Sequence, residues 1–310
     1  MTIRFQDIDA LPVNVSSKAV MEAFAPFVCA NPKSGDRHRQ MRLIWWNAMK
    51  RAARRLMGGH ESSGARNKDV IMGEYEGAWS RGFAAYDLSA GCRKPEPWIY
   101  RGEGLWADRA GTPRLRNVIL GGVIRALKPA RVLEVGCGNG INLLLLANQF
   151  PDVSFTGLEL TEAGNRVARQ LQQEDALPAA MASYPVTPGI DPKAFRRIDF
   201  VRGDATAMPF ADGAFDLVFT VLAVEQMERV RDKALSEIAR VSRGHVLNLE
   251  PFREANGTSL RRMHVFGRDY FRGAIGELPL HGLEPVWASM DFPQEVQLGA
   301  ALVLSRKTSL

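Results

Sequence analysis

The segment VLEVGCGNG, residues 132–140, constrains the fold of this chain more than any other feature. An apolar strand runs into three glycines at every second position, Gly136, Gly138 and Gly140, and the apolar residues 141–147 then predict a helix. Glycine permits a tight turn and lets a ligand lie close to the backbone, because no Cβ stands in the way. The first amides of the following helix are available to a polar or anionic ligand. We therefore expect a ligand site at this turn.

Strands and helices alternate on both sides of the glycine turn. The predicted strands are residues 131–135, 153–158, 200–201, 215–220 and 246–249, and the predicted helices are 115–127, 141–147, 162–173 and 230–241. This alternation is typical of a parallel sheet covered by helices on both faces. Two further strands, 283–290 and 298–305, predict a closing hairpin. The predicted fold class is α/β, with a Rossmann-like, doubly wound, mostly parallel seven-stranded sheet and a C-terminal antiparallel hairpin.

The organisation of the chain changes near Gly111-Thr112-Pro113, where an irregular, aromatic-rich region gives way to the regular alternation. We expect residues 1–112 to form a mainly helical appendage, a lid or accessory region. We expect residues 113–310 to form the ligand-binding domain. A proline-rich stretch, residues 174–193, predicts an inserted loop before the third strand.

Cysteine usage and hydropathy bear on the compartment. The three cysteines, Cys29, Cys92 and Cys137, have neither CxxC spacing nor a histidine cluster nearby. Such a sparse, odd set predicts neither a disulfide framework nor a metal site, and it favours a reducing environment. The N-terminus lacks the pattern of a secretory signal, and no segment approaches the roughly 20 apolar residues of a membrane span. We expect a soluble, cytoplasmic protein.

The glycine spacing discriminates among nucleotide-binding motifs. A dinucleotide fingerprint, G-x-G-x-x-G, requires Gly or Ala at the position of Ile141, and a phosphate-binding loop requires Gly-Lys-Ser/Thr. Neither pattern is present. The run Glu-x-Gly-x-Gly-x-Gly at 134–140 instead resembles the first motif of class I S-adenosylmethionine-dependent methyltransferases. Glu159, 19 residues after Gly140, and the segment GDATAMPFADGAFDLVF, residues 203–219, resemble the small-molecule branch of that family.

The resemblance covers roughly residues 115–250 and implies a methyltransferase that uses S-adenosyl-L-methionine and releases S-adenosyl-L-homocysteine. By the family's pattern, Glu159 would accept both ribose hydroxyls, Asp204 would accept the adenine amino group, and the Ala205 N–H would meet the adenine ring. Glu134 would order the glycine loop and the methionine amino group. The implied cofactor-binding residues are Glu134, Gly136, Gly138, Gly140, Glu159, Leu160, Asp204, Ala205 and Thr220.

Methyl transfer is an in-line displacement at an activated sulfonium, so the protein contributes mainly by positioning the reactants. A general base is needed only for an acceptor that keeps its proton at neutral pH. The candidate bases are Glu225, Glu250 and His264, and a helix-capping or loop-fixing role is the alternative for the two glutamates. The related branch often has Leu-Glu-His after the fourth strand, whereas this chain has Val224-Glu225-Gln226 and so lacks the usual imidazole.

The N-terminal region is rich in aromatic residues that are candidate walls for an acceptor pocket. Tyr100 and Trp106 are the substrate-contact candidates; Tyr75, Trp79, Tyr86 and Trp98 complete the set, and Arg101 and Arg109 are candidates for the cofactor carboxylate. The alternative is that these rings dock the N-terminal region onto the core.

Residues 36–57 predict a basic amphipathic helix with Met41, Ile44, Trp45, Ala48 and Ala52 along one side. A solvated face on a packed helix, peripheral contact with an anionic membrane, and nucleic-acid binding remain open. The chain has no recognisable RNA-binding module, so nucleic acid is the least favoured partner.

The leading hypothesis is a methyltransferase acting on oxygen or nitrogen of a small-molecule acceptor, such as a glycan, a lipid-linked compound or a secondary metabolite. One alternative is an RNA or protein methyltransferase that docks through the helix at 36–57. Against it, the fourth strand is followed by Val221-Leu222-Ala223 rather than the Asn/Asp-Pro-Pro-aromatic segment of many such enzymes. Another alternative is a non-catalytic regulatory protein that binds the cofactor. The sequence predicts neither the acceptor nor the oligomeric state.

Overall fold

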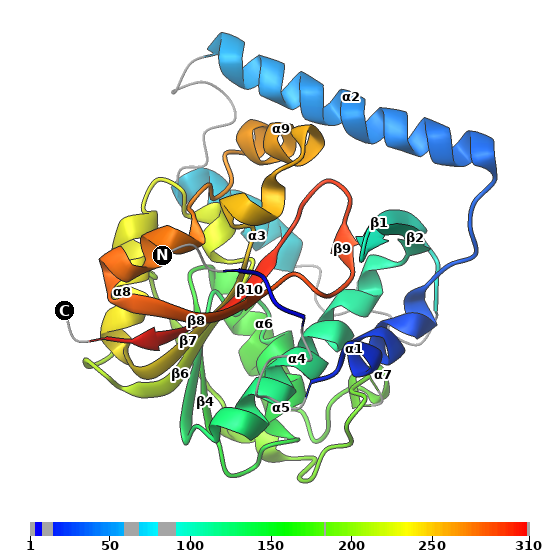
Figure 1. The fold of residues 1–310 in the computed structure, drawn as a ribbon. Helices are drawn as coiled ribbons and strands as arrows, with labels where there is room; N and C mark the ends of the chain where they lie inside the picture. The colour runs from blue at the N-terminus through cyan, green and yellow to red at the C-terminus, as the bar shows by residue number, and fades with distance from the viewer. Residues whose placement is uncertain (1–3, 8–14, 59–67, 80–90, 183, 309–310) are drawn as a thin grey trace.

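The computed structural model describes residues 4–7, 15–58, 68–79, 91–182 and 184–308. Its centre is a seven-stranded sheet with the order β5-β4-β3-β6-β7-β10-β8 (Figure 1). The first five strands in that order are parallel, and β10 pairs antiparallel with both β7 and β8. The predicted Rossmann-like sheet with a C-terminal antiparallel hairpin is confirmed.

The strands of the large sheet are β3 (Arg131–Val135), β4 (Ser154–Glu159), β5 (Asp199–Arg202), β6 (Phe215–Val221), β7 (Ser242–Glu250), β8 (Leu283–Ser289) and β10 (Ala301–Lys307). The helices around it are α1 (Ser17–Phe24), α2 (Ser34–Gly58), α3 (Lys68–Trp79), α4 (Thr112–Leu127), α5 (Ile141–Ala147), α6 (Glu162–Gln173), α7 (Ala179–Ala182), α8 (Arg231–Val241) and α9 (Ser259–Arg268).

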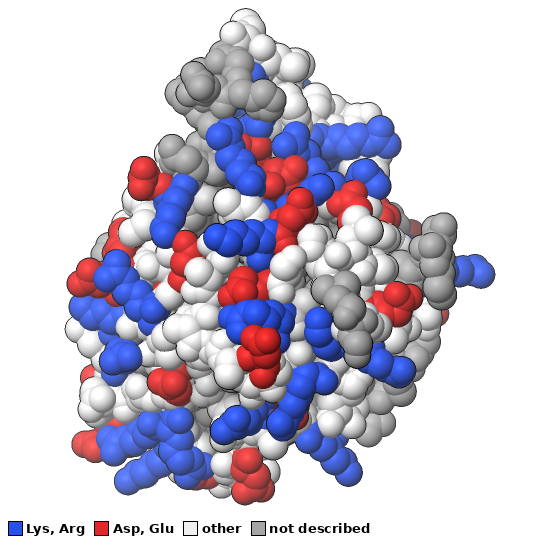
Figure 2. All heavy atoms as spheres, turned by 90° about the vertical axis from the view of Figure 1, so that its left-hand side faces the viewer, with Lys and Arg blue, Asp and Glu red and all other residues white. Residues whose placement is uncertain are grey.

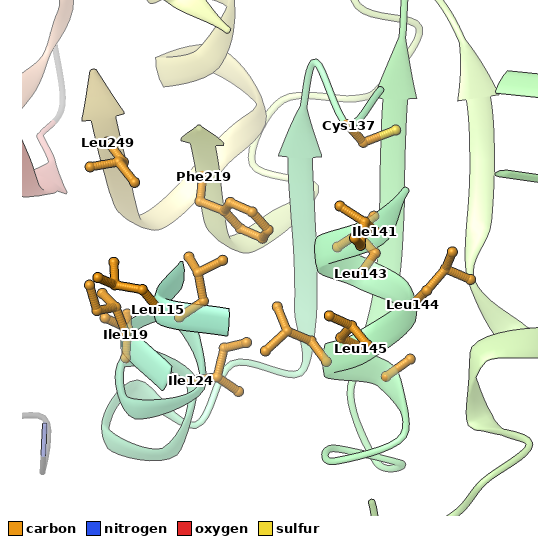
Figure 3. Close-up of a cluster of buried hydrophobic side chains, with 14 of the residues drawn as sticks. Leu115, Ile119, Ile124, Cys137, Ile141, Leu143, Leu144, Leu145, Phe219 and Leu249 are labelled. Atoms are coloured by element: carbon orange, nitrogen blue, oxygen red, sulfur yellow. The ribbon is translucent and has the colours of Figure 1, made fainter. Parts of the chain in front are cut away.

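The core lies on both faces of this sheet, because successive strand residues point to opposite sides. On one face, α4 and α5 pack their aliphatic side chains beneath Phe219 and Leu249 (Figure 3). On the other face, Leu133 and Val218 pack with Ile238 of α8. The two layers fix where each parallel strand ends, and therefore where the loops after β3, β4 and β5 lie.

The N-terminal region contributes a second, three-stranded antiparallel sheet in addition to its helices. β1 (Glu96–Tyr100) pairs with β2 (Glu103–Ala107) and also with β9 (Gln294–Glu295), a short strand in the connection between β8 and β10. This pairing joins the appendage to the C-terminal hairpin, and the sequence did not predict it. Of the helices in the described parts of the chain, none is long and apolar enough to cross a membrane.

The expectation that the cysteines form no disulfide is wrong. Cys29 and Cys92 are bonded, with their Cα atoms 5.4 Å apart, although they are separated by 63 residues in the sequence. The bond joins the segment after α1 to the segment that leads into β1. Cysteine number and spacing could not reveal it, because tertiary packing alone brings the two residues together.

Candidate cofactor and acceptor site

A cavity of about 640 Å³ opens at the carboxyl ends of β3, β4, β5 and β6. This is the edge at which ligands bind in open α/β sheets, because the loops that leave parallel strands gather there. Its floor is the glycine turn after β3, and its sides are the ends of β4 and β6, the loop after β5 and one side of α3.

The glycine turn requires glycine at each of its three positions for reasons internal to the protein. Gly136, Gly138 and Gly140 have φ of 75°, 55° and 77°, a region that side chains disfavour. A Cβ on Gly136 would lie 2.6 Å from the Cβ of Ala223, and one on Gly140 would lie 2.7 Å from the ring of Phe200. Close packing therefore adds to the ligand approach that the sequence indicated.

Glu159 ends β4 and is hydrogen-bonded to this turn. Its Oε2 accepts a hydrogen bond from the Gly138 N–H at 2.8 Å, and its Oε1 accepts from the N–H of Thr161 at 2.9 Å. The side chain is buried and lines the cavity. Glu159 thus holds the glycine turn and the start of α6 together, while its carboxylate remains at the cavity wall.

Asp204 lies in the loop after β5 and lines the same cavity. Its Oδ1 accepts from the N–H and hydroxyl of Thr206 at 2.9 and 2.8 Å, and its Oδ2 pairs with Nζ of Lys68 at 2.7 Å. Partial burial acts to raise the pKa of Asp204, but the hydrogen bonds from Lys68 and Thr206 outweigh it and lower the pKa. Asp204 is a fixed anion at neutral pH.

Glu134, on β3, lies beneath the glycine turn and is 1% exposed. Its Oε1 accepts from Nδ2 of Asn142 at 2.7 Å, whereas its Oε2 has no hydrogen-bond partner among the described residues. Burial raises the pKa of Glu134 to about 8, opposed by the Asn142 hydrogen bond and the charge of Arg116. The neighbouring Nδ2 of Asn139 likewise has no partner among the described atoms. Such buried atoms at a cavity wall fit a polar ligand.

Helix α3 covers the cavity from the N-terminal side. Lys68, Ile71, Tyr75 and Trp79 all line it, at the spacing of one helical face. The Trp79 ring lies directly over the glycine turn, 2.6 Å from where a Cβ on Gly138 would be. Helix α3 is thus a part of the N-terminal region that lies over the cavity. Tyr86, another of the aromatic candidates, lies outside the described residues.

The structure brings most of the predicted cofactor-binding residues to one cavity. The predicted residues that line it are Glu134, Gly136, Gly138, Glu159, Leu160, Asp204 and Ala205. Gly140 and Thr220 are outside the described lining; the hydroxyl of Thr220 accepts from Nδ2 of Asn248 at 2.9 Å, within the sheet.

The candidate bases are divided between the cavity and its surroundings. Glu225 lines the cavity, and its Oε1 accepts from Nε2 of Gln226. Glu250 lies behind the lining, where its carboxylate accepts from the backbone amides of residues 223, 224 and 225 at 3.0, 3.1 and 3.0 Å. Burial raises the pKa of Glu250 to about 7 and lowers that of His264 to about 4; His264 is also outside the described lining.

The two substrate-contact candidates lie in the small sheet, outside the described lining of the cavity. Trp106 is buried on β2, and Tyr100 on β1 lies against the guanidinium of Arg101. Arg101 forms a bidentate pair with Asp291 at 2.7 Å, whereas Arg109 does line the cavity and bonds Glu295 of β9 at 3.1 Å.

Several cavity residues have no sequence motif. Arg116, on α4, lines the cavity near Glu134, and Glu295 comes from β9. Lys68 reaches Asp204 from α3, and Glu76 on the same helix accepts from the N–H groups of residues 162 and 163 at the start of α6 at 2.6 and 2.9 Å. Of these residues, Arg116 alone had a sequence signal for a place in the site, because it is a charged residue on the otherwise apolar face of α4. In the described part of the chain, no group of His, Cys, Asp and Glu side chains is arranged to hold a metal ion.

Comparison with known proteins agrees with this geometry. Residues 133–246 match the family model described as a methyltransferase domain. A phthiotriol/phenolphthiotriol dimycocerosates methyltransferase of Mycobacterium tuberculosis is 34% identical over 113 residues, 36% of this chain and 34% of that protein. A malonyl-acyl-carrier-protein O-methyltransferase of Methylococcus capsulatus is 34% identical over 134 residues, 43% of this chain and 41% of the relative. The chain thus spans between a third and two-fifths of the length of these curated relatives.

Solved structures show the same fold over a larger part of the chain. Magnesium protoporphyrin IX methyltransferase from Synechocystis matches with a TM-score of 0.53 at 11% identity, covering 78% of this chain and all of that one. The cyclase SpnF matches with a TM-score of 0.52 at 16% identity, covering 77% of this chain and 96% of its own. Residues 133–246 thus match a methyltransferase domain model, and the fold around them is that of class I S-adenosylmethionine-dependent methyltransferases. S-adenosylmethionine is the cofactor of that class.

Proposed function

We propose that the protein transfers the methyl group of S-adenosylmethionine to an oxygen or nitrogen of a small-molecule acceptor. The observation that carries the proposal is the single cavity of about 640 Å³ that runs from the three acids Glu134, Glu159 and Asp204 to Glu225. A cavity of this size, covered by α3, is in the range of small-molecule sites.

The roles within the cavity follow from the donors and acceptors present. Glu159 and Asp204 would hold the ribose hydroxyls and the adenine amino group. The Oε2 of Glu134, which has no partner among the described residues, would accept from the methionine ammonium. Arg116, beside Glu134, is placed for a carboxylate. When bound, the cofactor supplies an electrophilic methyl group. Glu225, on the acceptor side of the cavity, is the proposed base for an acceptor that must lose a proton.

The acceptor class is not transferred from the relatives. Their printed names include a dimycocerosate, a malonyl-acyl carrier protein and, for an enzyme of Rauvolfia serpentina 29% identical over 115 residues, ajmaline. These acceptors are chemically diverse, and the family match lies in the cofactor-binding part of the chain. The cyclase of the same fold shows that the fold alone does not determine the reaction.

That the protein is cytoplasmic stays a prediction. The Cys29–Cys92 bond is of a type that persists mainly in oxidising environments, so the compartment needs its own measurement.

Calorimetry with S-adenosylhomocysteine tests the cofactor site. We expect 1:1 binding to the wild-type protein and its loss, by at least about 100-fold, in Glu159→Ala/Asp204→Ala, because charged hydrogen bonds contribute about 1.5–3 kcal/mol each. The matched control is Glu174→Ala/Asp199→Ala, which removes two exposed acids outside the described cavity lining and should bind normally. Wild-type binding in the first variant would refute the site.

Incubation of metabolite extracts with labelled S-adenosylmethionine tests turnover. We expect a labelled small molecule. The variant Glu225→Gln should still bind S-adenosylhomocysteine but should lose about 100-fold or more in turnover. Label found only in RNA or protein would favour the macromolecular alternative. Binding without any labelled product would favour a regulatory, non-catalytic role.

A further inference from the structure

The outward face of α2 has no role in the proposed function. This helix of 25 residues is about 37 Å long and lies across α9 at the top of the molecule (Figure 1). Of the α2 side chains described, Ala48 and Ala52 are the buried ones. They pack at α9, where a Cβ on Gly267 would come within 2.8 Å of the Ala52 nitrogen. The helix is therefore anchored along one side only.

The side of α2 opposite Ala48 and Ala52 carries both basic and large apolar residues. We call it the α2 ridge, and its members, three or four residues apart, are Arg39, Leu43, Trp46, Lys50, Arg54 and Met57. Leu43 is 50% exposed, Trp46 58% and Met57 81%. Large apolar side chains gathered on an exposed surface and bordered by charged residues mark an interaction site.

A second row of apolar side chains borders the ridge. Trp45, Met49 and Leu56 are also exposed, and a shallow hollow of about 440 Å³ lies among His38, Met41, Arg42, Trp45, Trp46 and Met49. The apolar surface therefore extends along the helix rather than forming one isolated spot.

Charge distinguishes α2 from the rest of the molecule. The helix has seven basic residues and one acidic residue, Asp36. The whole chain has 40 Lys and Arg against 34 Asp and Glu, so removing α2 leaves 33 of each. Figure 2 shows basic and acidic side chains intermixed over one face of the molecule. The net positive charge of the chain is thus equal to that of this one helix.

We propose that the α2 ridge docks onto a membrane surface containing anionic lipid. A helix that lies in the plane of a bilayer buries Trp, Leu and Met at the level of the headgroups, while Arg and Lys pair with lipid phosphates. The α2 ridge presents both kinds of side chain on one face. Nucleic acid would use the positive charge but would leave Leu43, Trp46 and Met57 against water and phosphate.

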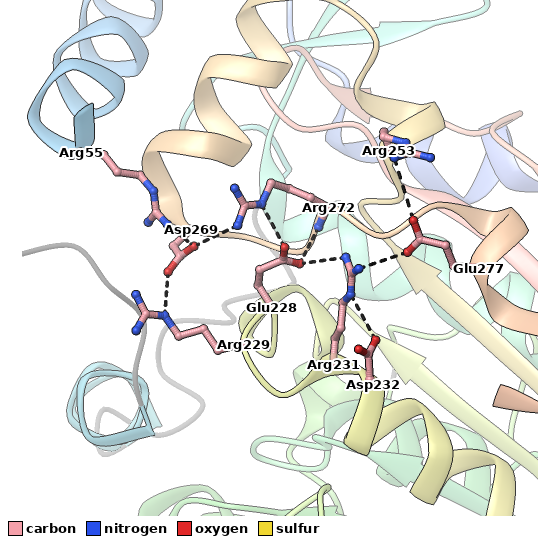
Figure 4. A network of polar contacts seen from close by, with 9 residues as sticks. All are labelled: Arg55, Glu228, Arg229, Arg231, Asp232, Arg253, Asp269, Arg272 and Glu277. Carbon is pink, nitrogen blue, oxygen red and sulfur yellow. Dashed lines mark hydrogen bonds and ion pairs between the residues drawn. The ribbon is translucent and has the colours of Figure 1, made fainter. Parts of the chain in front are cut away.

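Ion pairs connect helix α2 to the cavity wall. The Asp269 carboxylate, 1% exposed, pairs with Arg55 of α2 at 2.5 Å and with Arg229 at 3.3 Å (Figure 4). Arg229 lines the cavity. If the proposed function holds, a membrane-docked protein therefore presents its acceptor cavity to the bilayer in one orientation, which suits an acceptor delivered from the lipid.

Vesicle co-sedimentation of the full chain tests the docking surface independently of methyl transfer. We expect binding to phosphatidylcholine vesicles with about 30% phosphatidylglycerol, weak binding to pure phosphatidylcholine, and loss of binding at high salt. Tryptophan emission should shift to shorter wavelength as Trp46 enters the headgroup region.

Paired variants separate the contribution of the basic side chains to vesicle binding from that of the apolar side chains. Arg39→Gln/Lys50→Gln/Arg54→Gln should weaken binding on the order of 100-fold, and its control Arg131→Gln/Arg166→Gln/Lys233→Gln removes the same charges from other exposed positions. Leu43→Ser/Trp46→Ser/Met57→Ser should also lose binding, whereas Val186→Ser/Ile190→Ser/Leu280→Ser, at exposed sites elsewhere, should not. Unchanged binding of S-adenosylhomocysteine in every variant shows that each is folded.

The proposal is overturned if the wild-type protein ignores anionic vesicles while still binding S-adenosylhomocysteine. It is also overturned if the α2 ridge variants bind vesicles as well as their controls do. Salt-sensitive RNA binding without vesicle binding would assign the α2 ridge to nucleic acid. If the wild-type protein is a dimer that dissociates in Leu43→Ser/Trp46→Ser/Met57→Ser, the α2 ridge instead binds a second copy of the chain.

Discussion

The two walls of the cavity are built in different ways. The sheet wall comes from the loops after β3, β4 and β5, and its acids Glu134 and Glu159 are 1% and 6% exposed. The opposite wall is α3, and no residue of this helix is buried. The first wall is part of the core, whereas the second is attached to it by a few contacts.

Contacts at both ends of α3 join it to the sheet wall and to the start of α6. Lys68 pairs with Asp204, Glu76 caps the start of α6, and Trp79 lies on Gly138. Exposed elements with little buried apolar surface open at low free-energy cost. We infer that α3 is the part of the site that yields when a ligand enters, while the sheet wall keeps its geometry.

The largest expected effect concerns the sheet wall. Burial raises the pKa of Glu134 from 4.5 to about 8. Below pH 4.5 both the folded and the unfolded protein hold this proton; between pH 4.5 and 8 the unfolded chain releases it first, so folded stability falls by about 1.4 kcal/mol per pH unit. Glu134→Gln removes this titration. It should raise the free energy of unfolding by about 4 kcal/mol at pH 8 and by less than about 1 kcal/mol at pH 5.

Urea denaturation at the two pH values measures this difference, with the exposed Glu174→Gln as control. The same variant should weaken binding of S-adenosylhomocysteine, since the carboxylate at the cavity wall is lost. A stability change that is equal at pH 5 and pH 8 would contradict the raised pKa of Glu134.

The next effect concerns the N-terminal region. A disulfide across 63 residues removes chain entropy from the unfolded state, so Cys29→Ser/Cys92→Ser should lower the free energy of unfolding by about 3 kcal/mol. Dithiothreitol should lower the urea midpoint of the wild-type protein and leave that of the double variant unchanged. An equal response of both proteins to reductant would show that the bond is absent in solution.

The sheet could be predicted from sequence because its evidence is local. Apolar segments of strand length alternate with amphipathic helices, and parallel topology then places every strand's carboxyl end at one edge. The β1–β9 pairing and the Cys29–Cys92 bond join segments far apart in the chain. No local periodicity encodes such contacts.

The residues of the site likewise divide into those that local motifs predict and those that depend on tertiary packing. Glu134, Glu159 and Asp204 were predicted because they belong to short motifs, in or next to predicted strands, that resemble those of a known family. Lys68 and Trp79 depend on how α3 lies over the cavity, which the sequence does not specify. Tyr100 and Trp106 were selected for their chemistry alone, and the structure places them in a separate small sheet.

The third effect tests the contact between the two walls. Gly138 has φ of 55°, and a Cβ there would lie 2.6 Å from the Trp79 ring. Gly138→Ala should cost about 1–2 kcal/mol for the left-handed backbone, plus the clash with Trp79. Adding Trp79→Ala should relieve the clash, so that only the free-energy cost of the left-handed backbone remains. The free energy of unfolding of the four proteins in this double-mutant cycle gives the coupling.

Gly140 is the matched control for that cycle. It also has a positive φ, but a Cβ there would meet the ring of Phe200 in the core, 2.7 Å away. Gly140→Ala should therefore destabilise the protein equally with and without Trp79→Ala. Rescue of both glycine variants by the Trp79 substitution would mean that α3 does not lie on the turn as described.

The smallest effect concerns the ion pair between the walls. Nζ of Lys68 lies 2.7 Å from Oδ2 of Asp204, with the lysine side chain 56% exposed and the aspartate 33%. A pair this exposed contributes about 0.2–1 kcal/mol and is screened by salt. Lys68→Ala should therefore change S-adenosylhomocysteine affinity by less than about fivefold at low salt, and the change should vanish at high salt.

If α3 must move for a ligand to enter, the variant binds faster rather than slower, because the pair that holds α3 over Asp204 is gone. Stopped-flow binding measures both rates; slower association in Lys68→Ala would mean that the lysine attracts the ligand instead of closing the cavity.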